Sequence, residues 1–231
     1  MKWNFVSGMV LCAISGIASA QSYPSKPIRF IVGFAPGGVT DIVARALSQK
    51  LYERFGQQVV VDNRAGGSGM IAAVTTAKSP PDGYTLLMSS ISTMATNVSI
   101  VPNLPYDPLK DFAPVTLALV TPYMATVSAT MPVGNFREFL AYAKARPGQL
   151  NFGSSGTGGG AHLAIELLKV SAGLEMTHVP YKGASLALTD LIGGQIQLTF
   201  SQPPIVLPHI KSGKLKGLAI TSPKRLAALP E

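Results

Sequence analysis

The sequence predicts an α/β protein with two lobes. Short apolar runs that suit strands alternate with helical patterns over residues 28–88 and again over residues 150–221. This alternation favours a parallel sheet with helices on its faces. Prolines and aspartates interrupt the pattern between residues 101 and 114, so we expect the chain to cross between lobes there. The predicted parts are a leader at 1–20, lobe 1 at 21–114, lobe 2 at 115–222 and the start of a return to lobe 1 at 223–231.

The first residues have the pattern of a secretory signal peptide. Lys2 precedes an apolar run at residues 5–17, which ends in the small residues Ala18-Ser19-Ala20 that signal peptidase recognises. The run is shorter than the ~18 residues of a membrane-spanning helix. We therefore expect export with cleavage after Ala20. Cys12, the only cysteine, lies in the removed segment, which predicts no disulfide and no cysteine metal site in the mature chain.

Lobe 1 reads as consecutive strand, turn and helix units. A strand at residues 29–34 leads through a glycine turn to a helix at 41–55 that Gly56 ends, and a strand at 58–62 leads through a second glycine-rich turn to a helix at 70–78. A third strand at 84–88 ends in a hydroxyl-rich loop that contains Ser89 and Ser90. The glycine turns suggest positive φ angles and close backbone approach.

Lobe 2 repeats the same kind of unit. A β-prone run at residues 115–127 opens it, and Asn135 with Glu138 forms a capping box for a helix through residue 145. Strands follow at 150–154, 176–181, 195–200 and 215–221, with helices at 161–172, 184–192 and 205–212. A glycine loop at residues 156–160 lies between the first of these strands and its helix.

The stretch from residue 28 to residue 41 indicates an anion site. A strand that stops at a glycine turn before a helix directs backbone N–H groups and the positive end of the helix dipole outward, which favours a carboxylate or a phosphate. The alternative is an ordinary strand-to-helix connection. If the lobes face each other, this loop and the loop at residues 155–162 line opposite walls of one cleft, with His162 in the first turn of its helix.

Two classes of nucleotide-related function fit poorly. Gly156, Gly158 and Ala161 match the dinucleotide pattern G-x-G-x-x-A, but the acid expected at the end of the second strand is missing, since Glu175 precedes that strand. The formal net charge is +8, yet the cations are dispersed. No nucleic acid partner and no cofactor are therefore expected.

Catalytic and metal sites are also disfavoured. Neither Ser154 nor Ser155 lies in the G-x-S-x-G elbow of a serine hydrolase, and no base partner is evident. His162, His178 and His209 are far apart in the sequence and include no i, i+4 pair, which argues against zinc. A secreted serine hydrolase using Ser154 or Ser155 stays open as an alternative to a binding protein.

Several segments together resemble the Bug family of periplasmic solute-binding proteins, which serve tripartite tricarboxylate transporters. They are Tyr23-Pro24-Ser25-Lys26-Pro27-Ile28, Phe34-Ala35-Pro36-Gly37-Gly38 with Asp41, Asn63-Arg64-Ala65-Gly66-Gly67, Asp82-Gly83-Tyr84-Thr85-Leu86, Ser155-Gly156-Thr157-Gly158 with His162-Leu163, and Val179-Pro180-Tyr181-Lys182-Gly183. The resemblance implies a two-lobed, type II periplasmic-binding-protein fold that closes on a small carboxylate. Family members continue past residue 231, so it also implies a C-terminally truncated chain with an incomplete lobe 1.

The resemblance further implies a non-enzymatic, monomeric receptor in the periplasm, which delivers its ligand to transporter membrane components or presents it to a sensor kinase. No metal or cofactor is implied. Gln197 and Ser201 are neutral where the family usually has acids, which leaves the ligand open, and a non-functional fragment is a further alternative. The expected ligand-binding residues are Phe34, Ala35, Pro36, Gly37, Gly38, Asp41, Ser89, Ser90, Ser155, Gly156, Thr157, Gly158, His162 and Tyr181.

Overall fold

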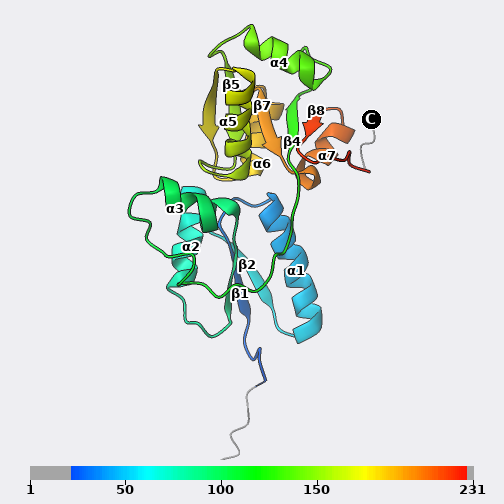
Figure 1. The fold of residues 1–231 in the computed structure, drawn as a ribbon. Coiled ribbons are helices and arrows are strands. Elements are labelled where there is room, and N and C mark those ends of the chain that lie inside the picture. Colours follow the sequence, from blue (N-terminus) through cyan, green and yellow to red (C-terminus); the bar gives the residue numbers. More distant parts are fainter. Residues whose placement is uncertain (1–21, 228–231) are drawn as a thin grey trace, which may run out of the picture.

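The chain forms two sheets joined by one crossing segment (Figure 1). The structure is a computed structural model and describes residues 22–227, so the predicted leader and cleavage site lie outside the described residues. A three-stranded sheet is built from residues 28–88 and a five-stranded sheet from residues 124–220. We refer to these sheets with their helices as lobe 1 and lobe 2.

Lobe 1 is a parallel sheet of order β2-β1-β3. Its strands are β1 (Ile28–Val32), β2 (Val59–Asn63) and β3 (Thr85–Met88). Helix α1 (Val39–Phe55) lies on one side of the sheet and α2 (Met70–Ala77) on the other, as Figure 1 shows. The predicted strand, turn and helix units are confirmed here, because every parallel connection runs through a helix.

The hydroxyl-rich segment after β3 is a loop at Ser89 and Ser90, as predicted, but it becomes helical from residue 91, so the prediction was wrong for Ser92 and Thr93. The helical part forms the π-helical turn η2 (Ser92–Thr96) and the short helix α3 (Asn97–Ile100). Tyr106 donates a 2.5 Å hydrogen bond to the carbonyl oxygen of Thr93, and both residues are buried. This buried contact compensates for the weak helix propensity of serine, threonine and asparagine.

The crossing segment, residues 112–123, has no regular secondary structure. The long β-prone run expected from residue 115 becomes a strand only in β4 (Met124–Ser128). Val115, Leu117 and Val120 are 83%, 78% and 80% exposed. Pro122 interrupts the run, and no described strand lies beside residues 115–120, so their backbone lacks a ladder partner.

Lobe 2 is a mixed sheet of order β6-β5-β7-β4-β8, so the expected parallel sheet is present in three of its strands and the other two depart from it. The strands β5 (Leu150–Ser154), β6 (Met176–Pro180) and β7 (Leu198–Ser201) are parallel, whereas β4 pairs antiparallel with β7 and β8 (Leu215–Ile220). The chain enters lobe 2 through β4 without a preceding crossover helix in that sheet. Antiparallel strands of this kind are common in otherwise parallel sheets.

The helices of lobe 2 are α4 (Phe136–Lys144), α5 (Gly160–Ala172), α6 (Ala184–Ile192) and α7 (Pro203–Lys211). The predicted capping box of α4 is present, since Asn135 accepts a 2.9 Å hydrogen bond from the N–H of Glu138. Fourteen buried residues, including Phe139, Phe152 and Ile165, form the larger core cluster of this lobe. The strands thereby hold the loops at their carboxyl ends against a rigid base.

Candidate functional site

The two lobes meet through the loops that follow their parallel strands. The N–H of Ala35 donates to the carbonyl oxygen of Lys182 (2.9 Å), and Ser185 Oγ donates to the carbonyl oxygen of Pro36 (2.7 Å). A third bond, from Ser68 Oγ to the carbonyl oxygen of Thr157, measures 2.7 Å. The carboxyl edge of each sheet, where α/β proteins bind ligands, therefore faces the other lobe.

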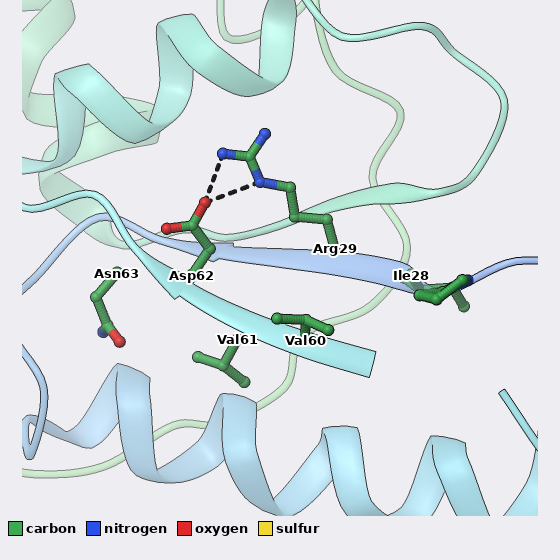
Figure 2. Close-up of a pocket in the computed structure, with 7 residues that line it drawn as sticks. Ile28, Arg29, Val60, Val61, Asp62 and Asn63 are labelled. Carbon is green, nitrogen blue, oxygen red and sulfur yellow. Dashed lines mark hydrogen bonds and ion pairs between the residues drawn. The ribbon is translucent and has the colours of Figure 1, made fainter. Parts of the chain in front are cut away.

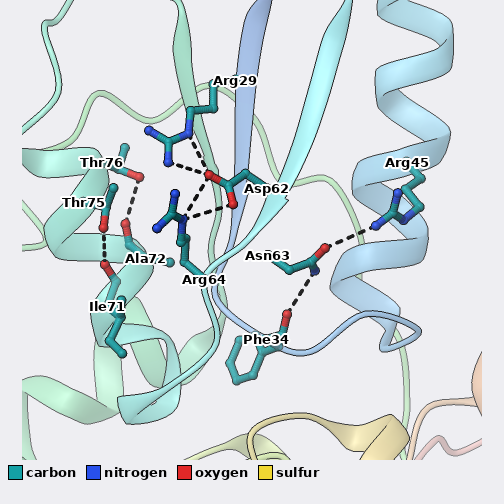
Figure 3. A network of polar contacts seen from close by, with 10 residues as sticks. All are labelled: Arg29, Phe34, Arg45, Asp62, Asn63, Arg64, Ile71, Ala72, Thr75 and Thr76. Atoms are coloured by element: carbon teal, nitrogen blue, oxygen red, sulfur yellow. Dashed lines mark hydrogen bonds and ion pairs between the residues drawn. The ribbon is translucent and has the colours of Figure 1, made fainter.

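The loop after β1 is held by the buried carboxylate of Asp41, which is 3% exposed. Asp41 Oδ2 accepts from the N–H of Gly37 (3.0 Å) and from Arg45 Nε (3.0 Å), and Oδ1 accepts from Asn63 Nδ2 (3.0 Å). Asn63 also donates to the carbonyl oxygen of Phe34 and accepts from Arg45 (Figure 3). The N–H of Gly37, predicted as a ligand donor, thus bonds within the protein.

These contacts fix the charge of Asp41. Burial by itself raises the pKa of the carboxyl group, but the hydrogen bonds from Arg45, Gly37 and Asn63 outweigh burial and lower the pKa below its ordinary value. Asp41 is therefore a charged group whose acceptors are directed at its own loop. Its predicted contact with a ligand stays a prediction.

The loop after β5 runs from Ser154 to Gly159. Ser154 Oγ donates to the carbonyl oxygen of Gly156 (3.0 Å) and lies 3.2 Å from the N–H of Gly156. The N–H of Gly158 donates to His162 Nδ1 (3.2 Å). Ser155 is half-buried and Thr157 is exposed. The N–H groups of Gly156 and Gly158, like that of Gly37, are engaged within the loop in this structure.

Two histidines contact this second loop through their side chains. The His162 and His178 rings stack with centroids 4.0 Å apart, and His178 stacks on Phe152 at 4.9 Å. His178 Nε2 lies 2.7 Å from Ser154 Oγ. Burial lowers the pKa of His162, and burial together with the neighbouring His162 lowers the pKa of His178 to about 4. Both rings are uncharged at neutral pH.

The contact between Ser154 and His178 corrects one sequence argument. The hydrolase alternative was disfavoured partly because no base partner was evident, and the structure does place a histidine beside Ser154. The Ser154 hydroxyl donates its proton to the carbonyl oxygen of Gly156, however, so His178 Nε2 is the donor in this contact and is not placed as a base. Ser154 is also only 1% exposed, and its hydroxyl is bonded within its own loop. The spacing of 24 residues between Ser154 and His178 on neighbouring strands gave no sequence signal for this pair.

A third polar group, which lies in lobe 1, consists of hydroxyls. Ser90 Oγ lies 2.8 Å from Ser92 Oγ and 3.1 Å from Thr93 Oγ1, and Ser92 donates to the carbonyl oxygen of Ser68 (3.1 Å). Ser89 is exposed. Sequence reasoning treated Ser68 only as part of a turn. Its position between two glycines was the available sequence signal. In the structure Ser68 has a φ of 53°, and its side chain reaches across the gap between the lobes.

Tyr181 is oriented by lobe 2 itself. Its hydroxyl donates a 2.6 Å hydrogen bond to Asp190 Oδ2 on α6. Burial and this carboxylate raise the pKa of Tyr181 to about 12. The hydroxyl is therefore a committed donor to Asp190, although the ring, which lies close to Gly153, remains near the loop after β5.

Two hollows of similar size are lined by residues of the described part of the chain. One of about 360 Å³ lies between the lobes, lined from lobe 1 by Gly37 and Ile42 and from lobe 2 by Ser185, Leu188, Thr189, Ile192, Pro204, Ile205 and His209. The other, of about 410 Å³, lies against β1 and β2 around the ion pair of Arg29 and Asp62 (Figure 2). Only the first joins the two lobes and borders a predicted loop.

Two features are absent from the described residues. Residues 22–227 include no group of three or more histidine, cysteine, aspartate or glutamate side chains placed to hold a metal ion. Within the same residues, no helix has the length and apolar character needed to cross a membrane.

Comparisons with known proteins agree with these features. A family model described as tripartite tricarboxylate transporter family receptor matches residues 43–231. Protein BugT of Bordetella pertussis is 41% identical over 225 residues, which cover 96% of this chain and 69% of BugT.

Two solved structures with bound acids also resemble this chain. Rpa4515 of R. palustris, solved with adipate, has a TM-score of 0.86 and 39% identity, over 88% of this chain and 68% of its own. MatC from Rhodopseudomonas palustris, with bound malate, has a TM-score of 0.82 and 31% identity, over 88% and 69%. Each match thus extends over both lobes of the described fold.

Proposed function

Because this chain belongs to the tripartite tricarboxylate transporter receptor family, we propose that it captures a small carboxylate between its two lobes and delivers it to the membrane components of such a transporter. The predicted resemblance to the Bug family and its periplasmic-binding fold is confirmed by this membership. The dicarboxylates bound by the two similar structures make adipate and malate the first ligands to test.

One observation carries the proposal. Three helices, α1, α5 and α6, begin at the loops between the lobes with glycine caps at Gly38, Gly159 and Gly183, and none of these caps makes a side-chain hydrogen bond. Their positive ends come from both lobes. An anion between the lobes would be favoured by these dipoles and by the N–H groups of the first turns.

The side chains divide into two roles under this proposal. Asp41 and His162 hold the loops, since each accepts the N–H of a loop glycine. Ligand contacts would come from the first turns of the helices and from hydroxyls near the gap, such as Ser155, Thr157 and Ser90. A carboxylate oxygen accepts several neutral donors at once, so no arginine or lysine is required in the site.

Calorimetry with the purified protein tests the proposal. We expect adipate or malate to bind, and adipamide, which has the shape of adipate without its charge, to bind at least tenfold more weakly because it lacks the charge that the helix ends stabilise. Equal binding of adipate and adipamide would contradict an anion site. Binding of neither acid, together with no co-purified carboxylate in native mass spectra, would overturn the proposal.

We also propose that the protein is not a hydrolase. The relatives are solute-binding proteins, and Ser154 is buried beneath its loop. A fluorophosphonate probe, which labels activated serines, is therefore expected to leave the protein unlabelled. Labelling that Ser154→Ala removes would restore the hydrolase alternative.

Export, partner and assembly complete the proposal. Family membership supports a periplasmic location, and N-terminal sequencing of the exported protein should begin at Gln21 if cleavage follows Ala20. We propose a monomer, which sedimentation can test, with transporter membrane components as its partner. A sensor kinase is the alternative partner, and it would be favoured if deleting the transporter leaves ligand-dependent gene expression intact.

A further inference from the structure

Three helices of this protein begin with the same hydrogen bond. The third helical residue accepts, through its side chain, the N–H of the glycine four residues earlier: Asp41 from Gly37 (3.0 Å), Glu138 from Gly134 (2.6 Å) and His162 from Gly158 (3.2 Å). Aspartate and glutamate accept throughout the neutral pH range. Histidine accepts only while Nδ1 carries no proton. Of these three contacts, the one that holds the loop after β5 is therefore the one whose acceptor is a histidine and can gain a proton nearest to neutral pH.

The local backbone of α1 and α5 is closely matched. Gly37 and Gly158 have φ angles of 80° and 75°. The caps that follow, Gly38 and Gly159, have φ and ψ of −78° and 166° and of −69° and 158°. A side-chain oxygen of a residue substituted at position 162 would thus accept a hydrogen bond from the N–H of Gly158, as Asp41 accepts one from the N–H of Gly37.

The second histidine ties the other end of the same loop. His178 Nε2 is 2.7 Å from Ser154 Oγ, and Ser154 in turn bonds to the backbone of Gly156. The His178 ring is enclosed between Phe152 and His162. One stack of rings therefore holds residues at both ends of the loop, Ser154 and Gly158.

Protonation of this stack is opposed by its surroundings. A charge on both rings would place two cations 4.0 Å apart in a half-buried site. On α5, Glu166 Oε1 is 3.9 Å from His162 Nε2, but Glu166 is also paired with Lys169 at 2.8 Å, and Lys169 lies 5.3 Å from the centre of the Phe152 ring. Strand β6 contributes His178, β5 contributes the uncharged Phe152 and Ser154, and the lobe 1 side chains nearest Gly158, Thr96 and Ile100, are uncharged.

We propose that His162 is a positioning residue that holds the loop of residues 154–159 in its ligand-binding shape only while its ring is uncharged, so that acid weakens carboxylate binding, and that His178 keeps the His162 ring and Ser154 in place. This inference rests on the proposed function for its ligand. A proton on His162 Nδ1 removes the acceptor of the Gly158 N–H, and that N–H must then turn away or stay unpaired. Below the pKa of His162, binding has to expel that proton, so affinity falls by up to about tenfold per pH unit.

The first test needs no ligand. Nuclear magnetic resonance of the ¹⁵N-labelled protein from pH 8 to pH 4.5 follows the histidine rings and the Gly158 amide together. We expect the Gly158 resonance to move in step with His162, and His178 to titrate last. A Gly158 resonance that stays fixed while His162 gains its proton would overturn the inference, whatever the ligand proves to be.

The second test measures adipate and malate affinity by calorimetry over the same pH range. His162→Asn supplies a non-titrating acceptor in the geometry of Asp41, so it should flatten the pH profile and bind more tightly than His162→Ala. Ser79→Ala changes a hydroxyl that bonds within lobe 1, away from the ring stack and from both hollows, so it should keep the wild-type profile, which also corrects for protonation of the ligands. Affinity that rises in acid, or a His162→Asn profile as steep as the wild type, would overturn the inference. Absence of binding at pH 8 would instead count against the proposed function.

Discussion

Ser68 donates a 2.7 Å hydrogen bond from its Oγ to the carbonyl oxygen of Thr157, which belongs to the other lobe. Ser68 also accepts, through its own carbonyl oxygen, a bond from Ser92. The hydroxyl group of lobe 1 is thereby connected to the loop after β5. This contact exists only when the two lobes are close, so it stabilises the closed form relative to an open one.

Ser68→Ala should shift the protein towards the open form. Alanine keeps the Cβ atom, so the cost of the positive φ angle is unchanged and only the hydroxyl is lost. One hydrogen bond of about 1 kcal/mol corresponds to a roughly fivefold weaker ligand affinity. Calorimetry measures the affinity, and small-angle scattering measures the mean separation of the lobes. Ser79→Ala is the matched control, because the hydroxyl of Ser79 bonds to the carbonyl oxygen of Thr75 on α2. It should change neither the affinity nor the separation of the lobes.

Asp41→Ala should destabilise lobe 1 and weaken binding. It leaves the N–H of Gly37 and the amide of Asn63 without their shared acceptor, while the half-exposed guanidinium of Arg45 becomes hydrated, so we expect a loss of about 2 kcal/mol. Urea denaturation measures the free energy of unfolding. A change below about 0.5 kcal/mol, the usual scale of surface substitutions, would contradict the role given to this network.

The same carboxylate predicts an acid-dependent stability. The folded pKa of Asp41 lies below its ordinary value of 3.8, so its contribution is complete above that value and is lost as the pH falls through the folded pKa. The histidines also make the protein less stable as the pH falls, but in a higher pH range. Because the pKa of His178 falls from 6.5 to about 4 on folding, the unfolded chain binds more protons between these values and stability decreases as pH falls from 6.5. Urea midpoints measured from pH 8 to pH 3 should show both steps. Asp41→Asn should reduce only the lower one, to which Asp62, whose pKa is also lowered by its arginine partners, contributes as well.

The sequence located most elements and the loops of the site, and the failures have physical causes. Glycine turns and apolar periodicity depend on neighbouring residues, so the α1 and α5 units and the capping box of Asn135 could be predicted. The antiparallel pairing of β4 and the helical turn at Ser92–Thr96 depend on contacts with distant residues. The pairing of Ser154 with His178 across two strands depends on sheet register, for which a single sequence carries no local signal.

The expected donors show a further limit. Glycine spacing indicated N–H groups near a ligand, but it could not show which of them were already used. Gly37 and Gly158 donate to side chains four residues later, and Ala35 donates across to Lys182. That distribution depends on side-chain rotamers, which periodicity does not determine.

Gly158→Ala should hinder closure of the lobes. A Cβ atom at Gly158 would lie 2.5 Å from Ile100 Cδ1 and 3.1 Å from Thr96 Cγ2, both in lobe 1. Gly148→Ala is a matched control, because its φ of 70° imposes similar backbone strain while nothing lies within 4 Å of the added atom. Both variants should lose about 1 kcal/mol of stability. Only Gly158→Ala should also lose at least tenfold in ligand affinity by calorimetry. Equal affinities for the two variants would mean that the lobes do not meet at Gly158.

Hydrogen exchange should be slower in lobe 2 than in lobe 1. The core cluster of lobe 1 has three buried members, Phe30, Val32 and Ala44, whereas lobe 2 has clusters of fourteen and eight. Amide protection follows the free energy of local opening, and this free energy increases with the apolar area that opening exposes. We therefore expect amides of β5 and β7 to exchange at the slowest rates and those of β2 and β3 faster by at least tenfold. Mass spectrometry of exchanged peptides gives both rates in one sample.

Addition of a ligand that closes the lobes should slow amide exchange most in the loops at residues 34–38 and 154–159. Uniform protection of the two sheets would show that lobe 1 gains stability from contacts other than its own core.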